Sequence, residues 1–224
     1  VWKERWGMAT EVWCYSRLLI LGVCMKVAIV DYGMGNIKSV SSVLKYLGIN
    51  NIIISKKSKE LIAADKLILP GVGSFSKAME EIKRLDLHHV LDRIVLEDRK
   101  PILGICLGMQ LLCQDSDEDG GSEGLKYIDA SCKRFDIDNH KIPHVGFNQV
   151  KSNINSKLYD DLPQENDFYF THSFRIQSNR NIHQSICHYG ENFIASYEID
   201  NMAGTQFHPE LSQTNGIKVL RNYF

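Results

Sequence analysis

The sequence predicts an α/β fold with a mostly parallel central sheet and helices on both faces. Two observations support this prediction. Short apolar runs, each about one strand long, alternate with amphipathic stretches through the first half of the chain. These runs are apolar at successive positions, as expected for strands buried on both faces. The second half has shorter runs and more turn residues, which predicts antiparallel or mixed strands added to the same sheet.

The first strand and helix follow directly from the residue pattern. Residues 26–31 (KVAIVD) form a continuous apolar strand that ends on a polar residue. Residues 36–47 place their apolar side chains on one helical stripe, and Gly48 can close that helix. A second strand follows over residues 51–55 (NIIIS). This order of strand, helix and strand is the repeating unit of a parallel sheet.

The next elements lead to a turn rich in glycine. Residues 67–69 form a third strand, which ends in the tetrapeptide PGVG at 70–73, and residues 75–96 are predicted to be helical. Residues 102–105 form a fourth strand because they are a short apolar run bounded by proline and glycine. Residues 107–114 contain good helix formers. A tight turn must therefore join the fourth strand to this helix.

Cys106 lies in that turn, within the pentapeptide GICLG at 104–108. Glycines on both sides of a central nucleophile allow a tight, strained strand-to-helix turn. The adjacent helix N-terminus favours the thiolate, which is the reactive form of cysteine. A lone buried cysteine usually behaves as a small hydrophobe. Here the order of strand, glycine turn and helix favours a nucleophile instead.

His208 and Glu210 can complete a catalytic triad. A histidine can take the thiol proton, and a carboxylate two residues later can orient the imidazole. Together with Cys106 they predict covalent acyl transfer through a thioester. No histidine pair has the spacing of a zinc site, and the loop after the first strand lacks the third glycine of a dinucleotide motif. We therefore expect neither a metal nor another cofactor.

Composition excludes several other classes of protein. A chain of 224 residues with 44% hydrophobic content and a net charge of -1 is typical of one soluble globular domain. A charge this close to neutral gives no reason to expect nucleic acid or a membrane surface as a partner. Six cysteines without a C-x-x-C pair are interpreted as reduced thiols of a cytoplasmic protein.

The first 24 residues differ from the rest of the chain. They begin without methionine and contain three tryptophans with scattered charges. Their apolar run at 18–23 is too short for a bilayer, which takes about 20 residues. We interpret residues 1–24 as a non-native or upstream leader that is poorly ordered, and residues 25–224 as a single domain.

Six ordered motifs, all within residues 31–210, characterise the stretch from Lys26 to Phe224. These motifs are DYGMGN at 31–36, LPGVGSF at 69–75, GICLGMQLL at 104–112, KIPHVGFN at 141–148, YFTHS at 169–173 and QFHPE at 206–210. The chain resembles the class I (triad) glutamine amidotransferases and, within them, the glutaminase subunit of imidazole glycerol phosphate synthase. The cysteine and histidine motifs mark the superfamily, and the first, second and fourth motifs narrow the resemblance to this subunit.

The resemblance implies roles for the residues at matching positions. Cys106 would attack the carboxamide of glutamine, His208 would transfer the proton, and Glu210 would hold the imidazole. The oxyanion would be bound by the backbone N–H of Leu107 and by the segment containing Val72. Five further residues match family positions around the substrate: Gly73, Gln110, Glu118, His172 and Ser173.

The residue types alone leave other interpretations open for this second group. Gln110 could be a solvated helix residue, and Glu118 lies in an acidic run of a kind that is usually solvated. His172 could be structural or support a ligand from behind. His144, in the fourth motif, is interpreted as a loop histidine whose hydrogen bonds are satisfied.

The resemblance also implies a second protein chain. A glutaminase domain without an attached synthase domain implies that ammonia passes to a partner. In this family the partner is a cyclase, a (β/α)₈ barrel that forms a heterodimer with the glutaminase and makes imidazole glycerol phosphate for histidine biosynthesis. Asn36 matches a family position that faces this partner.

One departure from the family pattern keeps alternatives open. Where the family carries a lysine that contacts the cyclase, this chain has Leu211, which would remove a charge pair. A paralogue that supplies ammonia for amidination of a bacterial surface sugar is therefore an alternative. A catalytically inactive module that regulates a barrel partner is disfavoured by the intact Cys106, His208 and Glu210. A cysteine peptidase or chaperone of related topology is disfavoured by the context of Gln110.

Overall fold

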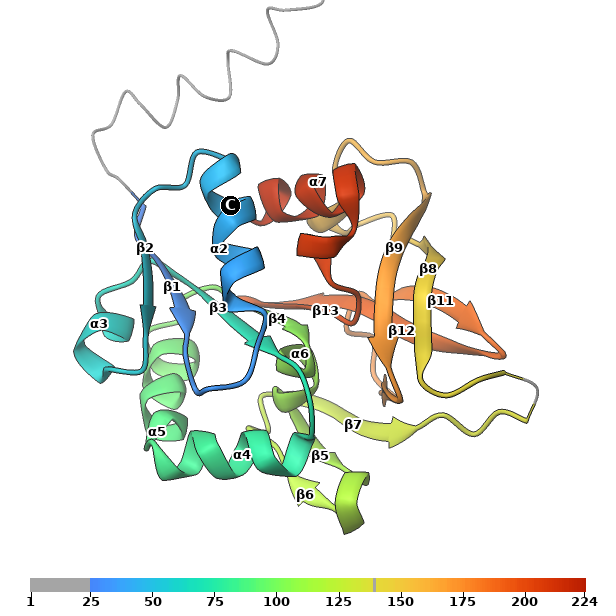
Figure 1. Cartoon of the computed structure of the whole chain (residues 1–224), viewed down its shortest axis with the longest axis horizontal. Coiled ribbons are helices and arrows are strands. Elements are labelled where there is room, and N and C mark those ends of the chain that lie inside the picture. The colour runs from blue at the N-terminus through green and yellow to red at the C-terminus, as the bar shows by residue number, and fades with distance from the viewer. Residues whose placement is uncertain (1–24, 139) are drawn as a thin grey trace, which may run out of the picture.

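The computed structural model describes residues 25–138 and 140–224. The predicted leader at 1–24 lies outside these described residues. Most of the strands belong to one large mixed sheet, and helices lie on both sides of it (Figure 1). In the described part of the chain, no helix has the length and apolarity needed to cross a bilayer.

The large sheet has nine strands, in the order β2-β1-β3-β4-β13-β12-β11-β8-β9. Its parallel half contains β2 (Ile52–Ser55), β1 (Val27–Val30), β3 (Lys66–Gly71), β4 (Ile102–Cys106) and β13 (Met202–Thr205). Its antiparallel half adds β12 (Glu191–Ile199), β11 (Ser185–Tyr189), β8 (His144–Lys151) and β9 (Glu165–His172). The predicted division into a parallel half and antiparallel additions is confirmed.

A second sheet takes up the remaining strands, so the expectation that all added strands join the large sheet was wrong. It contains β10 (Phe174–Gln177), β7 (Ile128–Arg134), β5 (Cys113–Ser116) and β6 (Ser122–Glu123), in that order. The helix predicted over 107–114 is correspondingly shorter. Helix α6 (Leu107–Leu111) ends early because β5 pairs with β7 and β6, and this tertiary pairing outweighs local helix propensity.

The helices pack on opposite faces of the large sheet. One face carries α2 (Ile37–Tyr46) and α7 (Gln213–Tyr223), and the other carries α3 (Ser58–Ile62), α4 (Phe75–Arg84), α5 (Leu87–Leu91) and α6. Successive side chains of β1 alternate between the two cores. Val27 and Ile29 pack with α2 and α7, whereas Ala28 and Val30 pack with the helices opposite. Burial on both sides explains why this strand is apolar throughout.

The helix predicted over 75–96 is interrupted. Asp86 has a φ of 56°, which ends the helical path after α4, and α5 then leads into a π-helical turn at Asp92–Glu97.

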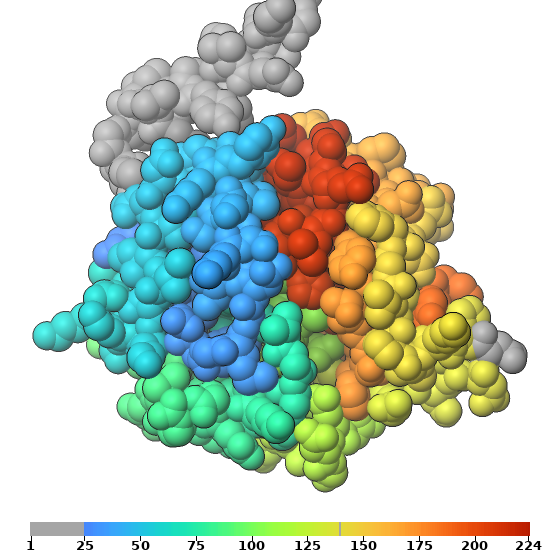
Figure 2. Space-filling model, in the orientation of Figure 1, coloured from blue at the N-terminus to red at the C-terminus, as the bar shows by residue number. Residues whose placement is uncertain are grey.

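On the opposite face of the sheet, the blue surface of α2 adjoins the red surface of α7 (Figure 2). The first and the last helix of the described chain therefore lie side by side.

The pairing of β4 with β13 positions the candidate site. These strands are parallel and neighbours at the centre of the sheet, and Ile105 lies opposite Thr205. Their carboxyl ends therefore reach the same edge of the sheet, where α/β folds bind their ligands. Cys106 ends one strand, and the segment that contains His208 follows the other.

Candidate active site

Cys106 occupies the strained turn that the sequence predicts. Its φ of 53° and ψ of -111° are unfavourable for a residue with a Cβ and cost about 1–3 kcal/mol. The flanking glycines are needed for space. A Cβ on Gly104 would lie 2.6 Å from the Met109 nitrogen, and one on Gly108 would lie 1.7 Å from the Leu69 oxygen. The turn can therefore form only with glycine at both positions.

The three predicted triad residues come together beside this turn. His208 is buried, and its Nδ1 lies 2.9 Å from Glu210 Oε1. Burial opposes a charge on the imidazole, but the Cys106 thiol and the Glu210 carboxylate outweigh this effect and raise the pKa of His208 to about 10. The imidazole is therefore basic enough to accept the thiol proton.

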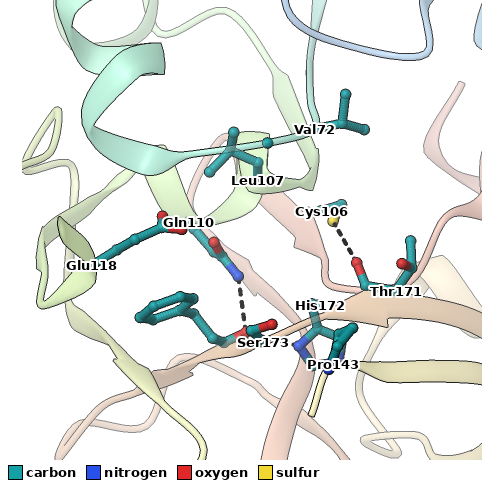
Figure 3. A pocket seen from close by; sticks show the side chains of 11 residues that line it. Val72, Cys106, Leu107, Gln110, Glu118, Pro143, Thr171, His172 and Ser173 are labelled. Carbon is teal, nitrogen blue, oxygen red and sulfur yellow. Dashed lines mark hydrogen bonds between the residues drawn. The ribbon is translucent and has the colours of Figure 1, made fainter.

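The thiol and the imidazole do not yet share a hydrogen bond. Within the described residues, the buried Nε2 of His208 has no hydrogen-bond partner. The thiol of Cys106 donates instead to the Thr171 carbonyl, with a sulfur–oxygen distance of 3.9 Å (Figure 3). A rotation of the Cys106 side chain would turn its proton from Thr171 to His208.

Asn36 holds the Glu210 carboxylate in place. It lies directly before α2, and its Nδ2 donates to Glu210 Oε1 over 3.2 Å. The same oxygen also accepts the hydrogen bond from His208, so two donors fix the carboxylate. The sequence predicted a partner-facing Asn36, and its contact with Glu210 was not foreseen.

A pocket of about 250 Å³ opens beside Cys106. Its walls are formed by Val72, Gly73, Cys106, Leu107, Gln110, Glu118, Pro143, Thr171, His172, Ser173 and Phe174 (Figure 3). Both predicted oxyanion residues and all five predicted substrate-binding residues are among them. His208, Glu210 and Asn36 do not line the pocket.

The predicted oxyanion segment packs against the start of α6. A Cβ on Gly71 would lie 2.7 Å from Tyr32 Oη and 2.8 Å from Leu107 Cβ, so only glycine allows this approach. The buried Tyr32 hydroxyl donates to the Pro70 carbonyl over 2.7 Å. Val72 follows on the pocket wall, close to Leu107 and Cys106 in Figure 3.

Gln110 and Glu118 are both held by the protein and are not simply solvated. Gln110 is only 5% exposed, and its Nε2 donates to the Phe174 carbonyl over 3.1 Å and to Gln206 Oε1 over 2.8 Å. The half-buried Glu118 accepts a 2.7 Å hydrogen bond from the backbone N–H of Phe75. Burial raises the pKa of Glu118 above its ordinary value, although the Phe75 N–H opposes this effect.

His172 is supported from behind by His144. His172 Nδ1 lies 2.7 Å from the Phe174 carbonyl, its Nε2 lies 3.1 Å from His144 Nδ1, and His144 Nε2 lies 3.4 Å from Asn148 Nδ2. A carbonyl can only accept, so the Nδ1 of His172 must carry a proton. The His172 Nε2 is then an acceptor, so the proton of the His144 imidazole also lies on its Nδ1. Burial lowers the pKa of His172 to about 3 and that of His144 to about 4, so both are neutral near pH 7.

A group of potential metal ligands lies elsewhere in the fold. The ligand atoms of Asp86, His88 and His89 lie within 4.8 Å of one another. None of these residues lines the pocket.

Four residues that contact the site have no individual role predicted from the sequence. These residues are Tyr32, Thr171, Phe174 and Gln206. Three of them lie within motifs that the sequence analysis identified, which was the available signal. Phe174 directly follows the fifth motif, and its contribution is a backbone carbonyl, which residue identity does not reveal.

Comparison with known proteins identifies close relatives. The family model for Glutamine amidotransferase class-I matches residues 28–224. The imidazole glycerol phosphate synthase subunit HisH 1 of Campylobacter jejuni is 43% identical over 198 residues, which cover 88% of this chain and 98% of that protein. The subunit HisH of Aquifex aeolicus is 39% identical over 200 residues, with 89% and 96% covered.

Solved structures support the fold. One glutamine amidotransferase matches with a TM-score of 0.65 at 16% identity, over 88% of this chain and 96% of that one. Another glutamine amidotransferase, from Thermotoga maritima, matches with a TM-score of 0.61 at 16% identity, over 90% of this chain and 83% of that one. The predicted fold class is confirmed.

Proposed function

Because this chain belongs to the class I glutamine amidotransferases, we propose that it hydrolyses glutamine as the glutaminase subunit of an imidazole glycerol phosphate synthase. The observation that carries this proposal is the strained turn that places Cys106 on the pocket wall, with the His208–Glu210 pair buried next to the Cys106 sulfur. We take residues 25–224 as one amidotransferase domain.

The first half-reaction forms a thioester. His208 Nε2 takes the proton of the Cys106 thiol, and the sulfur attacks the carboxamide carbon of glutamine. The carbonyl oxygen becomes an oxyanion, which the backbone N–H groups of Leu107 and of the Val72 segment stabilise by about 3 kcal/mol each when aligned. The carbon–nitrogen bond then breaks, and His208 returns the proton so that ammonia leaves.

The second half-reaction releases glutamate. His208 removes a proton from water, whose oxygen attacks the thioester carbon. The carbon–sulfur bond breaks, and the sulfur leaves as thiolate and is reprotonated. Glu210 holds the imidazole orientation throughout and stabilises its charged form.

The pocket offers acceptor groups to the substrate. The Glu118 carboxylate supplies a negative charge for the α-ammonium group of glutamine. Both hydrogens of the Gln110 amide nitrogen are used within the protein, so this side chain offers its oxygen as an acceptor. Gly73, His172 and Ser173 complete the walls around the substrate.

Ammonia must then reach a second active site. Free ammonia is mostly protonated near neutral pH, and only the neutral form can act as a nucleophile. We therefore assign a cyclase partner, a (β/α)₈ barrel that forms a heterodimer with this chain and makes imidazole glycerol phosphate in histidine biosynthesis.

The Leu211 side chain favours an alternative in which a different molecule receives the ammonia. It is 41% exposed directly after Glu210, where the family pattern places a lysine. A paralogue that supplies ammonia for amidination of a surface sugar would have a different partner and no need for that cation. Complementation of a bacterium that lacks its own glutaminase subunit distinguishes the two: growth without histidine supports the histidine pathway, and failure to grow despite glutaminase activity supports the alternative.

The nucleophile is tested by substitution and by labelling. In complex with the partner, Cys106→Ala should abolish glutamate release while the two chains still co-purify. Cys187→Ala, at a buried cysteine that does not line the pocket, should retain turnover. A glutamine-derived alkylating analogue should label Cys106 in the complex. Turnover in Cys106→Ala would refute the proposed mechanism, and absence of labelling with partner present would favour an inactive regulatory module.

A further inference from the structure

Gln206 lies against the nucleophile from the neighbouring strand. Since Ile105 and Thr205 are opposite each other, the next residues, Cys106 and Gln206, leave the sheet side by side. Gln206 is fully buried, and its Nε2 donates to Cys106 Sγ over 3.7 Å. We propose that Gln206 is a further catalytic residue, which holds the reacting sulfur and couples it to Gln110. This inference rests on the proposed function.

Three contacts fix which way the Gln206 amide points. The Phe174 carbonyl can only accept, so the nitrogen of Gln110 must face it. The second hydrogen of that nitrogen is donated to Gln206 Oε1 over 2.8 Å. Because its oxygen is occupied in this way, Gln206 can present only its nitrogen to the sulfur.

The polar contacts, and not the volume, are what make a glutamine necessary here. Burying a side-chain amide costs free energy unless both of its polar atoms are bonded. An apolar side chain of similar length would fill the same space without that cost. At Gln206 both polar atoms contact residues of the pocket, namely Gln110 and Cys106. Because both contacts are residues of the pocket, we assign the Gln206 amide a part in the reaction.

The N–H donor acts whenever the sulfur carries negative charge. This occurs after the thiol proton moves to His208, and again when the carbon–sulfur bond of the thioester breaks. A hydrogen bond to a charged group is stronger than one to a neutral group, so Gln206 stabilises the thiolate more than the thiol or the thioester. No bond to Gln206 is made or broken.

The other end of Gln206 affects the substrate. By accepting from Gln110 Nε2, it leaves Gln110 Oε1 as the free polar atom of that side chain. Loss of this acceptor would free the Gln110 amide to rotate. Gln206 therefore links the state of the nucleophile to the orientation of a group that binds glutamine.

Two variants separate these roles. Gln206→Met removes both contacts without adding a charge, whereas Gln206→Glu keeps an oxygen for Gln110 and replaces the N–H donor to sulfur by a carboxyl group. Alkylation of Cys106 by iodoacetamide, followed by mass spectrometry across pH, reports the sulfur alone. In Gln206→Met we expect the midpoint of that profile to rise by about one pH unit, with alkylation at pH 7 about tenfold slower. In Gln206→Glu the midpoint should rise at least as far, because an ionised carboxylate beside the sulfur also opposes the thiolate. Of the two, only Gln206→Met should also raise KM for glutamine.

The controls keep other causes apart. Tyr32, Cys132 and His208 each interact electrostatically with the Cys106 sulfur, and both variants leave these side chains in place. Gln114→Met, at a glutamine outside the pocket, should leave the alkylation profile unchanged. Circular dichroism confirms that each variant is folded.

Two results are decisive. An unchanged alkylation midpoint in both variants, with only a lower melting temperature, would show that Gln206 merely packs and would overturn the inference. Iodoacetamide does not require glutamine turnover, so a wild-type complex that is alkylated but hydrolyses no glutamine would refute the proposed function separately.

Discussion

Replacing Tyr32 by phenylalanine should slow glutamine hydrolysis about tenfold while the protein remains folded. Tyr32 is 1% exposed, and its hydroxyl donates to the Pro70 carbonyl over 2.7 Å. Removing it deprives a buried carbonyl of this donor, which costs about 1–3 kcal/mol of stability. For a chain of this length, that loss lowers the melting temperature by about 2–4 °C for each kcal/mol.

The larger effect should fall on catalysis. Pro70 precedes the Gly71–Val72 peptide, whose N–H is the proposed second oxyanion donor, and Tyr32 Oη approaches Gly71 closely. Without the hydroxyl, this segment has one restraint fewer. Complete loss of an oxyanion donor costs about a hundredfold to a thousandfold in kcat, so a misaligned donor should cost about tenfold.

Tyr223 is a matched control, because its hydroxyl also donates to a backbone carbonyl of β3. The hydroxyl of Tyr223 donates to the Leu67 carbonyl over 3.2 Å, near the other end of β3. Tyr223→Phe should lower stability to a similar or smaller extent without changing kcat. Glutamate release in the presence of the partner and thermal unfolding measure the two effects. Equal kcat values for the two variants would refute the assignment of Tyr32 to the oxyanion segment.

Two further predictions concern the triad and the buried histidines. Asn36→Leu removes one of the two donors to the Glu210 carboxylate and should lower kcat at saturating glutamine about tenfold. An unchanged kcat together with weaker binding of the partner would show that Asn36 acts only at the interface. The folded-state pKa values of His172 and His144, about 3 and about 4, lie below the ordinary value of 6.5, so the unfolded chain binds protons first. The free energy of unfolding should therefore fall as pH drops from 6.5 towards 4, by roughly 1 kcal/mol per pH unit for the fully buried His172. Urea unfolding at stepped pH measures this slope, which His144→Gln should reduce. A flat profile would contradict the assigned neutral imidazoles.

The parts of the fold predicted correctly depend on local physics. The apolar run at 26–31 identifies a strand buried on both faces, because each side chain must face one of the two cores. The glycines at 104 and 108 identify the strained turn, because only glycine avoids the Met109 and Leu69 backbones. Each of these predictions needs few neighbours. Met109 lies within the strand–turn–helix unit itself, and Leu69 lies on the adjacent parallel strand β3.

The parts predicted incorrectly depend on partners distant in the sequence. The helix formers after Leu111 do not continue α6, because residues of β5 find hydrogen bonds in β6 and β7. Gln110 and Gln206 are 96 positions apart, and a motif can place both near the same sheet edge without showing that their amides meet. Orientation of a polar side chain becomes predictable only after the carbonyl that fixes it has been located.

The parallel pairing of β4 with β13 fixes how far apart the Cys106 thiol and the His208 imidazole lie. A slip of one residue would displace one strand by about 3.3 Å and turn its side chains to the opposite face. The register of this strand pair does not depend on the order in which the two strands are synthesised. A circularly permuted chain, with new termini in an exposed loop and this pair intact, should therefore recover the same chemistry after refolding.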